Sequence, residues 1–205
     1  MPCQEGYGNC EVIPPPSCGA YGASASNGRK IAYYQASNIR YRACNRIQPS
    51  QIIIDGLTHL LLAFAAIDTV SFEVTPTDPS DTVLYTQFTA LKTPQLQTWI
   101  AIGGFDFNNP GPTFTTWSDM CSTAANRAAF ITSLIKFMDI WGFQGVDIDW
   151  EYPGIAARGG RPEDTANLVS LVKEMRAAFG TKYGISTVLY GLHLSSPPCD
   201  DTDKR

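Results

Sequence analysis

The chain has 205 residues, of which 44% are hydrophobic and 17% are charged, and its formal net charge is −4. Such a length allows one large globular domain, or one domain with a small appendage. The acidic balance and the lack of a basic run disfavour nucleic acid as a partner, and no stretch approaches the ~18 apolar residues of a membrane span.

The first 28 residues differ in composition from the rest. They hold Cys3, Cys10 and Cys18 among Gly, Pro and Asn, which is typical of a small disulfide scaffold in an oxidising compartment. The alternative is a disordered proline-rich leader. Because no basic start followed by an apolar run marks a signal peptide, we expect the natural N-terminus to lie upstream. We place a domain boundary near Gly28.

Metal chemistry is not expected. The six cysteines form no Cys-x-x-Cys pair, and His59 and His193 lie far from any cysteine cluster. A zinc site needs such a cluster of ligands. We therefore expect no zinc site.

Beyond residue 28, strand-like and helix-like segments alternate. Strands are expected at residues 30–35, 58–66, 98–104, 145–151 and 183–190. Helices with an apolar stripe are expected at 81–92, 122–141 and 164–179. This alternation favours a parallel α/β sheet, in which ligands bind beyond the carboxyl ends of the strands.

The strand at 145–151 carries the main chemical signal. Asp147, Asp149 and Glu151 are spaced by two, and apolar residues fill the gaps between them. The spacing puts three carboxylates on one face, with neighbouring Cα atoms ~7 Å apart. Three buried acids this close cannot all ionise normally, so at least one pKa should rise. One acid that keeps its proton beside another that stays anionic is the chemistry of glycosidic bond cleavage. The alternative is an edge strand with a solvated acidic face.

Two topologies fit the alternation. A doubly wound sheet gives no reason for three inward acids on a central strand, whereas inward side chains of a (β/α)8 TIM barrel line the space below the active site. A full barrel needs eight strands in about 250 residues, so we expect about the first five βα units here. The final stretch 195–205 no longer resembles such a unit.

The segment Gln144–Pro153, QGVDIDWEYP, resembles the D-x-x-D-x-D-x-E signature of glycoside hydrolase family 18, the chitinases. Gln144 stands where the family more often has Asp. The resemblance extends over about residues 29–190 and looks closest to fungal chitinases similar to killer-toxin α subunits, which carry chitin-binding modules. By this resemblance, residues 1–28 are the remnant of a Cys-rich chitin-binding module and linker. Residues 29–205 are then the N-terminal part of a catalytic domain.

The resemblance implies hydrolysis of β-1,4-linked N-acetylglucosamine polymers with retention of configuration and without a metal or organic cofactor. Glu151 would protonate the glycosidic oxygen, Asp149 would support the substrate's acetamido group as nucleophile, and Asp147 would share a proton with Asp149. A chitin-binding, lectin-like protein is one alternative, although such proteins usually lack the catalytic Glu. An inactive truncated chitinase-like chain is another.

Aromatic rings stack on sugar rings, and glycines at strand ends let the backbone approach a ligand. The expected substrate-binding residues are Tyr34, Phe64, Gly103, Gly104, Phe105 and Tyr152. Tyr34 and Phe64 fit a pocket floor and a core position equally well. Ala101 replaces the serine of the family's S-x-G-G motif, and Trp150 is expected in the core, opposite Glu151.

The implied partner is chitin or a chito-oligosaccharide, and we expect a monomer in an extracellular location. An open piece of a barrel exposes its strand edges and its inner face. We therefore expect the isolated chain to aggregate or fold partly, with the three acids facing water and without turnover.

Overall fold

The computed structural model describes residues 28–189, within which Arg29–Leu189 form one compact unit. Its strands are β1 (Ile31–Gln35), β2 (His59–Ile67), β3 (Val74–Pro76), β4 (Gln97–Gly103), β5 (Gly145–Asp149) and β6 (Gly184–Thr187). Its α-helices are α1 (Ser37–Tyr41), α2 (Asp81–Thr89), α3 (Thr116–Cys121), α4 (Ala124–Trp141) and α5 (Asp164–Phe179). All but the last residue of the expected module remnant at 1–28, and the stretch 190–205, lie outside the described residues.

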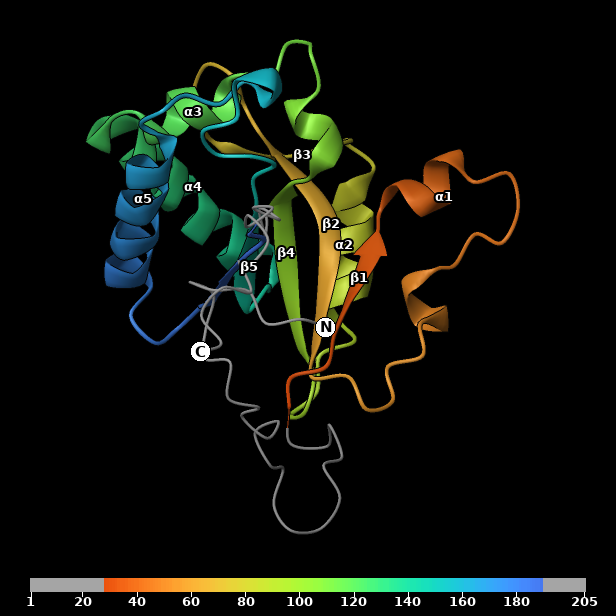
Figure 1. The fold of residues 1–205 in the computed structure, drawn as a ribbon. Coiled ribbons are helices and arrows are strands. Elements are labelled where there is room, and N and C mark those ends of the chain that lie inside the picture. The colour runs from red at the N-terminus through yellow and green to blue at the C-terminus, as the bar shows by residue number, and fades with distance from the viewer. Residues whose placement is uncertain (1–27, 190–205) are drawn as a thin grey trace, which may run out of the picture. The chain divides into compact units, whose positions relative to one another are not determined.

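Five strands run parallel in the order β1-β2-β4-β5-β6, and β3 pairs antiparallel with β2. Figure 1 shows this order from β1 (orange) through β2 and β4 to β5 (teal). In a doubly wound sheet the order of the strands reverses at a switch point. Here each successive parallel strand is added on the same side of the one before it. The described residues thus show five successive parallel strands wound in one direction, the first four each followed by a helix, as in a (β/α)8 barrel.

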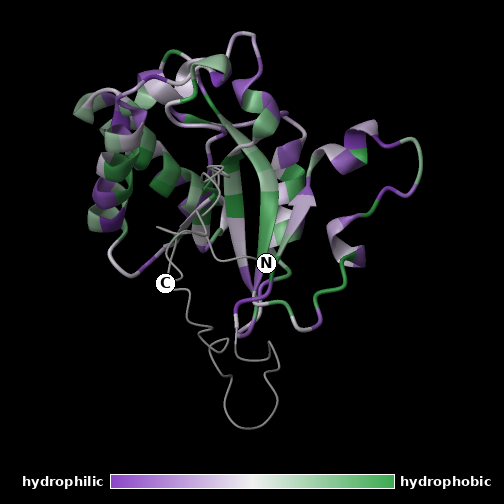
Figure 2. Cartoon of the chain, viewed as in Figure 1, coloured by the Kyte–Doolittle hydropathy of each residue, from purple (hydrophilic) through white to green (hydrophobic). Residues whose placement is uncertain are grey.

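Helices cover one face of the sheet. Alternate residues of the central strands, such as Leu62, Ile100 and Ile148, are fully buried in one cluster with apolar residues of α2, α4 and α5. Figure 2 shows hydrophobic residues concentrated along β2 and β4. Burying a side chain of this size contributes about 1.5–3 kcal/mol. Since strand residues alternate, the remaining positions face the other side of the sheet.

Helix α4 begins and ends at clear local signals. The Thr123 hydroxyl accepts a hydrogen bond from the Asn126 backbone N–H at 3.1 Å, which satisfies a free donor of the first turn. Gly142 ends the helix with a left-handed φ of 79°, a conformation that glycine adopts without steric cost. The predicted start at residue 122 was two residues early because Thr123 is the cap.

A single indole fills the inner side of the sheet near the amino ends of the strands. Gly145 and Gly184 leave space for it: an added Cβ would lie 2.5 Å and 2.1 Å, respectively, from atoms of the Trp99 ring. The Trp99 ring also meets His59 edge to face, with centroids 4.9 Å apart. The sheet therefore has a packed floor below the acids of β5.

Candidate active site

Strand β5 and its carboxyl end present Asp147, Asp149 and Glu151. Asp147 is 2% and Asp149 6% exposed, while Glu151 is half-buried. Trp150 points to the opposite side and stacks on Trp117 of α3, with centroids 5.6 Å apart, which confirms its core position. The expectation that all three acids face water was wrong, because β4 and β6 flank β5 on both sides and enclose the first two carboxyl groups.

Asp149 is the acid with the shifted protonation equilibrium. Burial raises the pKa of Asp149 to about 7, and the charge of Glu151, a hydrogen bond with Glu151 and the charge of Asp147 act in the same direction. Its Oδ1 atom is buried without a hydrogen-bond partner among the described residues, an arrangement that disfavours the ionised form. This confirms the prediction that at least one pKa in the row is raised. Asp149 therefore titrates near neutral pH, in contact with Glu151.

Two hydroxyl groups orient Asp147. The Tyr33 hydroxyl of β1 donates to Oδ2 at 2.8 Å, and the Ser186 hydroxyl of β6 donates to Oδ1 at 2.6 Å. Ser186 is the register partner of Asp147 on β6, and Ala101 is its partner on β4. Because each carboxylate oxygen accepts a hydrogen bond, the group is held in one orientation from two strands.

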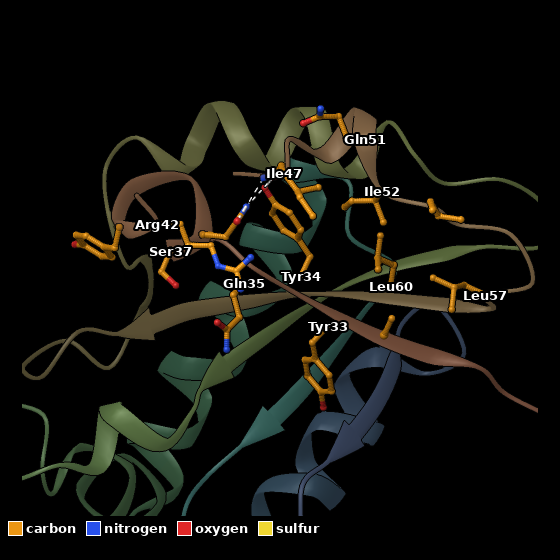
Figure 3. Close-up of a pocket in the computed structure, with 14 residues that line it drawn as sticks. Tyr33, Tyr34, Gln35, Ser37, Arg42, Ile47, Gln51, Ile52, Leu57 and Leu60 are labelled. Carbon is orange, nitrogen blue, oxygen red and sulfur yellow. Dashed lines mark hydrogen bonds between the residues drawn. The ribbon is translucent and has the colours of Figure 1, made fainter. Parts of the chain in front are cut away.

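Tyr33, and not Tyr34, belongs to this site. Tyr34 is buried on the opposite side of β1, where its hydroxyl donates to the Ile47 carbonyl at 2.7 Å and its ring packs on Phe88 of α2. Figure 3 shows the two tyrosine rings pointing to opposite sides of the strand. The prediction of Tyr34 as a substrate contact was wrong because the pleat of β1 turns it toward the helices. Sequence reasoning missed Tyr33, although alternation along β1 separates the two rings.

A cavity of about 640 Å³ lies beside β1, and Tyr33, which contacts Asp147, is among the residues that line it. Its lining includes Tyr34, Ile47, Ile52 and Leu57, together with residues of α1. None of the three acids of β5 lines this cavity. Its walls are mainly apolar, so it lacks the carboxylate chemistry of β5.

Glycines bring the ends of β4 and β5 close together. The Gly104 N–H donates to the Asp149 carbonyl at 2.8 Å. An added Cβ on Gly103 would lie 2.5 Å from the same carbonyl oxygen, and one on Gly104 would lie 2.7 Å from the Phe64 ring. Both glycines have positive φ, 98° and 85°. The structure therefore places Gly103, Gly104 and the half-buried Phe64 beside Asp149.

The segments that follow β4 and β5 complete the rim of the site. Phe105 follows Gly104 and is 52% exposed, and Tyr152 follows Glu151 and is half-buried. The peptide bonds Ala63–Phe64 and Glu151–Tyr152 are cis. Arg158 spans the two segments: its Nε donates to the Glu151 carbonyl at 3.1 Å, and its guanidinium lies over the Phe105 ring. Sequence reasoning missed Arg158.

Within residues 28–189, no group of three or more His, Cys, Asp or Glu side chains is placed to hold a metal ion. None of the helices in this part of the chain has the length and hydropathy needed to cross a membrane. Of the six cysteines, the two within it, Cys44 and Cys121, are free thiols.

Parallel strands wound in one direction, with a row of carboxylates at the end of a central strand, are features of barrel-type glycoside hydrolases. Residues 29–198 match the family model of the glycosyl hydrolases family 18, and the chain belongs to this family.

Known relatives extend well beyond the matched region. Chitotriosidase-1 of Mus musculus is 32% identical over 153 residues, which cover 73% of this chain and 31% of that protein. The endochitinase of Manduca sexta is 30% identical over 161 residues, 76% of this chain and 28% of that protein. Catalytic domain 2 of the Ostrinia furnacalis Group II chitinase superposes with a TM-score of 0.70 at 28% identity, over 78% of this chain and 42% of that one. A mutant of that domain has been solved in complex with penta-N-acetylchitooctaose. The chain thus spans about a third of the length of these curated relatives.

Proposed function

We propose that the protein is a chitinase, which hydrolyses β-1,4 bonds between N-acetylglucosamine units. The observation that carries this proposal is the inward row of Asp147, Asp149 and Glu151, in which burial raises the pKa of Asp149 to about 7. Membership of family 18 and the chito-oligosaccharide bound by the Ostrinia furnacalis relative support the substrate class.

The geometry supports a mechanism in which the substrate supplies its own nucleophile. Glu151 stands at the open end of the row and protonates the glycosidic oxygen. The acetamido oxygen of the substrate attacks the anomeric carbon and forms an oxazolinium ion, whose N–H is held by Asp149. Glu151, now anionic, takes a proton from a water molecule that attacks from the same side, so the configuration is retained.

Asp149 and Asp147 orient the acetamido group and stabilise the charge that develops on it. In the free site Asp149 binds a proton far more readily than an ordinary carboxyl group and is hydrogen-bonded to Glu151. Asp147 is fixed by Tyr33 and Ser186, so it presents a stable partner with which Asp149 shares its proton when the acetamido group binds. The role of this pair is to orient and stabilise charge, and the proton donor to the glycosidic oxygen remains Glu151.

The sugar rings next to the cleaved bond have a set of candidate contacts at the rim. They are Phe64, Gly103, Gly104, Phe105 and Tyr152, all beside the ends of β2, β4 and β5. The half-exposed Phe105 ring offers an apolar face for stacking on a pyranose ring. The glycines let the Asp149 carbonyl and the Phe64 ring pack closely against the end of β4.

The alternative function is a chitin-binding, lectin-like protein that keeps the site without turnover. Glu151 favours the enzyme, because a protein that only binds has no need of a proton donor at this position. We further propose that the parent protein belongs to the fungal killer-toxin-like subgroup, acts as a monomer outside the cell and carries a chitin-binding module. The cysteine-rich composition of residues 1–28 supports the last two features.

Replacement of the acid tests the proposal in the full-length gene product. Glu151→Gln keeps the shape of the side chain but removes the transferable proton, so kcat on chitotetraose should fall by about a hundredfold or more. Binding of the tetrasaccharide, measured by calorimetry, should stay nearly unchanged. Glu163→Gln, at an exposed position before α5, is the matched control and should retain activity.

Two outcomes would contradict the proposal. Activity of Glu151→Gln within about tenfold of the wild type would remove Glu151 as the acid. A wild-type protein that binds chitotetraose without cleaving it would establish the lectin-like alternative.

A thiazoline analogue of N-acetylglucosamine should inhibit the wild type, since it mimics the cyclic intermediate.

A further inference from the structure

The guanidinium of Arg158 joins the two segments that follow β4 and β5 at the rim of the site. Arg158 ends a short 3-10 turn, Ala156–Arg158, after β5. Its Nε donates to the Glu151 carbonyl at 3.1 Å, its Nη1 donates to Asn109 Oδ1 at 2.6 Å, and its Nη2 donates to the Phe105 carbonyl. A planar fork of donors is suited to hold several acceptors in fixed directions at once.

The same guanidinium covers part of the Phe105 ring. Its central carbon lies 3.9 Å from the ring centroid, within the range of cation–π attraction. Phe105 is nevertheless 52% exposed, so much of its ring remains available to a ligand. Arg158 therefore holds Phe105 in two ways, through its backbone carbonyl and through its ring.

The backbone of Arg158 is itself fixed. The Asn108 side chain donates to the carbonyls of Arg158 and Phe114, both at 3.3 Å. The next residue, Gly159, has a φ of 74°, and an added Cβ there would lie 1.9 Å from the Phe114 carbonyl oxygen. The turn is thus pressed against the segment after β4, and the guanidinium has little freedom to move away from Phe105.

We propose that Arg158 is a positioning residue that sets the Phe105 ring at a fixed place relative to Glu151. One rigid group contacts both residues, so the distance from the ring to the acid depends on the fork. The proposal rests on the proposed function, in which Phe105 stacks on a sugar ring beside the cleaved bond. Arg158 would therefore affect the affinity for oligosaccharides that are long enough to cover Phe105. The chemical step would depend on Asp147, Asp149 and Glu151.

A double-mutant cycle in the full-length gene product tests this role. Arg158→Met keeps the length of the side chain and removes the fork, and Phe105→Ala removes the ring. Each change should raise KM for chitohexaose by about five- to tenfold, with kcat changed much less. If Arg158 acts through Phe105, the double variant should be no worse than Phe105→Ala alone.

Two further variants separate the fork from charge and from general stability. Arg158→Lys keeps the charge but cannot reach three acceptors, so it should resemble Arg158→Met and give no rescue. Arg161→Met is the matched control, since Arg161 lies in the same segment and pairs with Asp119 at 2.6 Å. Its KM should equal that of the wild type.

The inference is overturned if Arg158→Met raises KM by less than about twofold, or if its effect multiplies with that of Phe105→Ala. Rescue by Arg158→Lys would overturn the fork as the cause. Calorimetry also gives the Kd for chitohexaose of the wild type, the two single variants and the double variant. Coupling in Kd without any hydrolysis by the wild type supports Arg158 as the positioning residue and overturns only the proposed catalytic activity. A wild type that neither binds nor cleaves the hexasaccharide overturns both.

Discussion

The raised pKa of Asp149 predicts how the stability of the fold changes with pH. The folded protein holds the Asp149 proton more tightly than the unfolded chain does, since burial lifts this pKa from 3.8 to about 7. The stability that this tighter binding provides is fully present below pH 4 and is lost as the pH rises through about 7. Asp149→Asn removes the titrating group while keeping the shape of the side chain. The variant should therefore gain stability relative to the wild type as the pH increases.

The size of the effect follows from the shift. About three pKa units at about 1.4 kcal/mol each give an upper bound of about 4 kcal/mol between pH 4 and pH 8. Structural relaxation and water penetration around the ionised group reduce this bound, so we expect about 2 kcal/mol. The charge of Glu151 adds to the same shift, and its repulsion also disappears in the variant.

Urea unfolding at five pH values between 4 and 8, followed by tryptophan fluorescence, measures the effect. The quantity of interest is the free energy of unfolding of Asp149→Asn minus that of the wild type at each pH. Asp106→Asn, at an exposed carboxylate after β4, controls for the loss of one carboxyl group. A difference for Asp149→Asn that stays constant from pH 4 to pH 8 would refute the reasoning.

Two more predictions concern the orientation of Asp147 and the floor of the sheet. Tyr33→Phe removes the donor to Asp147 Oδ2, so kcat on chitotetraose should fall by about tenfold with little change in binding; an unchanged kcat would contradict the role of this hydroxyl. Gly145→Ala places a Cβ 2.5 Å from the Trp99 ring and should cost about 1–3 kcal/mol of stability in urea unfolding. Gly111→Ala, whose Cβ would lie 3.8 Å from its nearest neighbour, should cost much less, and equal losses would count against the packing argument.

Periodicity predicted the main elements because their signals are long or strongly alternating. The observed β2, β4 and β5 differ from the expected spans by no more than two residues at either end. The sequence analysis missed β3 and α3, which have three and six residues. Segments this short carry less than two helical turns or two strand repeats, so tertiary contacts decide their conformation.

The candidate site was predictable where it depends on one segment, and it was missed where it depends on several. The acids of β5 follow from spacing within one strand. Arg158 could not be found in this way, because its partners Asn109 and Phe105 lie 49 and 53 residues earlier in the chain. Asp164, the first residue of α5, likewise depends on several segments: its carboxylate accepts hydrogen bonds from Ser118 of α3 and from the backbone of Gly154 and Arg161. These contacts form only when distant segments meet.

The floor of the sheet couples the side-chain volumes that three strands can carry. Trp99 of β4 occupies the volume that side chains at Gly145 of β5 and Gly184 of β6 would otherwise need. The side chains at these three positions therefore share one fixed volume. A larger residue at either glycine is compatible with the fold only beside a smaller residue at position 99. A stable protein can therefore acquire a side chain at either glycine only after a smaller residue has replaced Trp99. Exchange of β5 alone between relatives would carry this dependence with it, and a donor strand with a side chain at position 145 would collide with Trp99 before it reached its register.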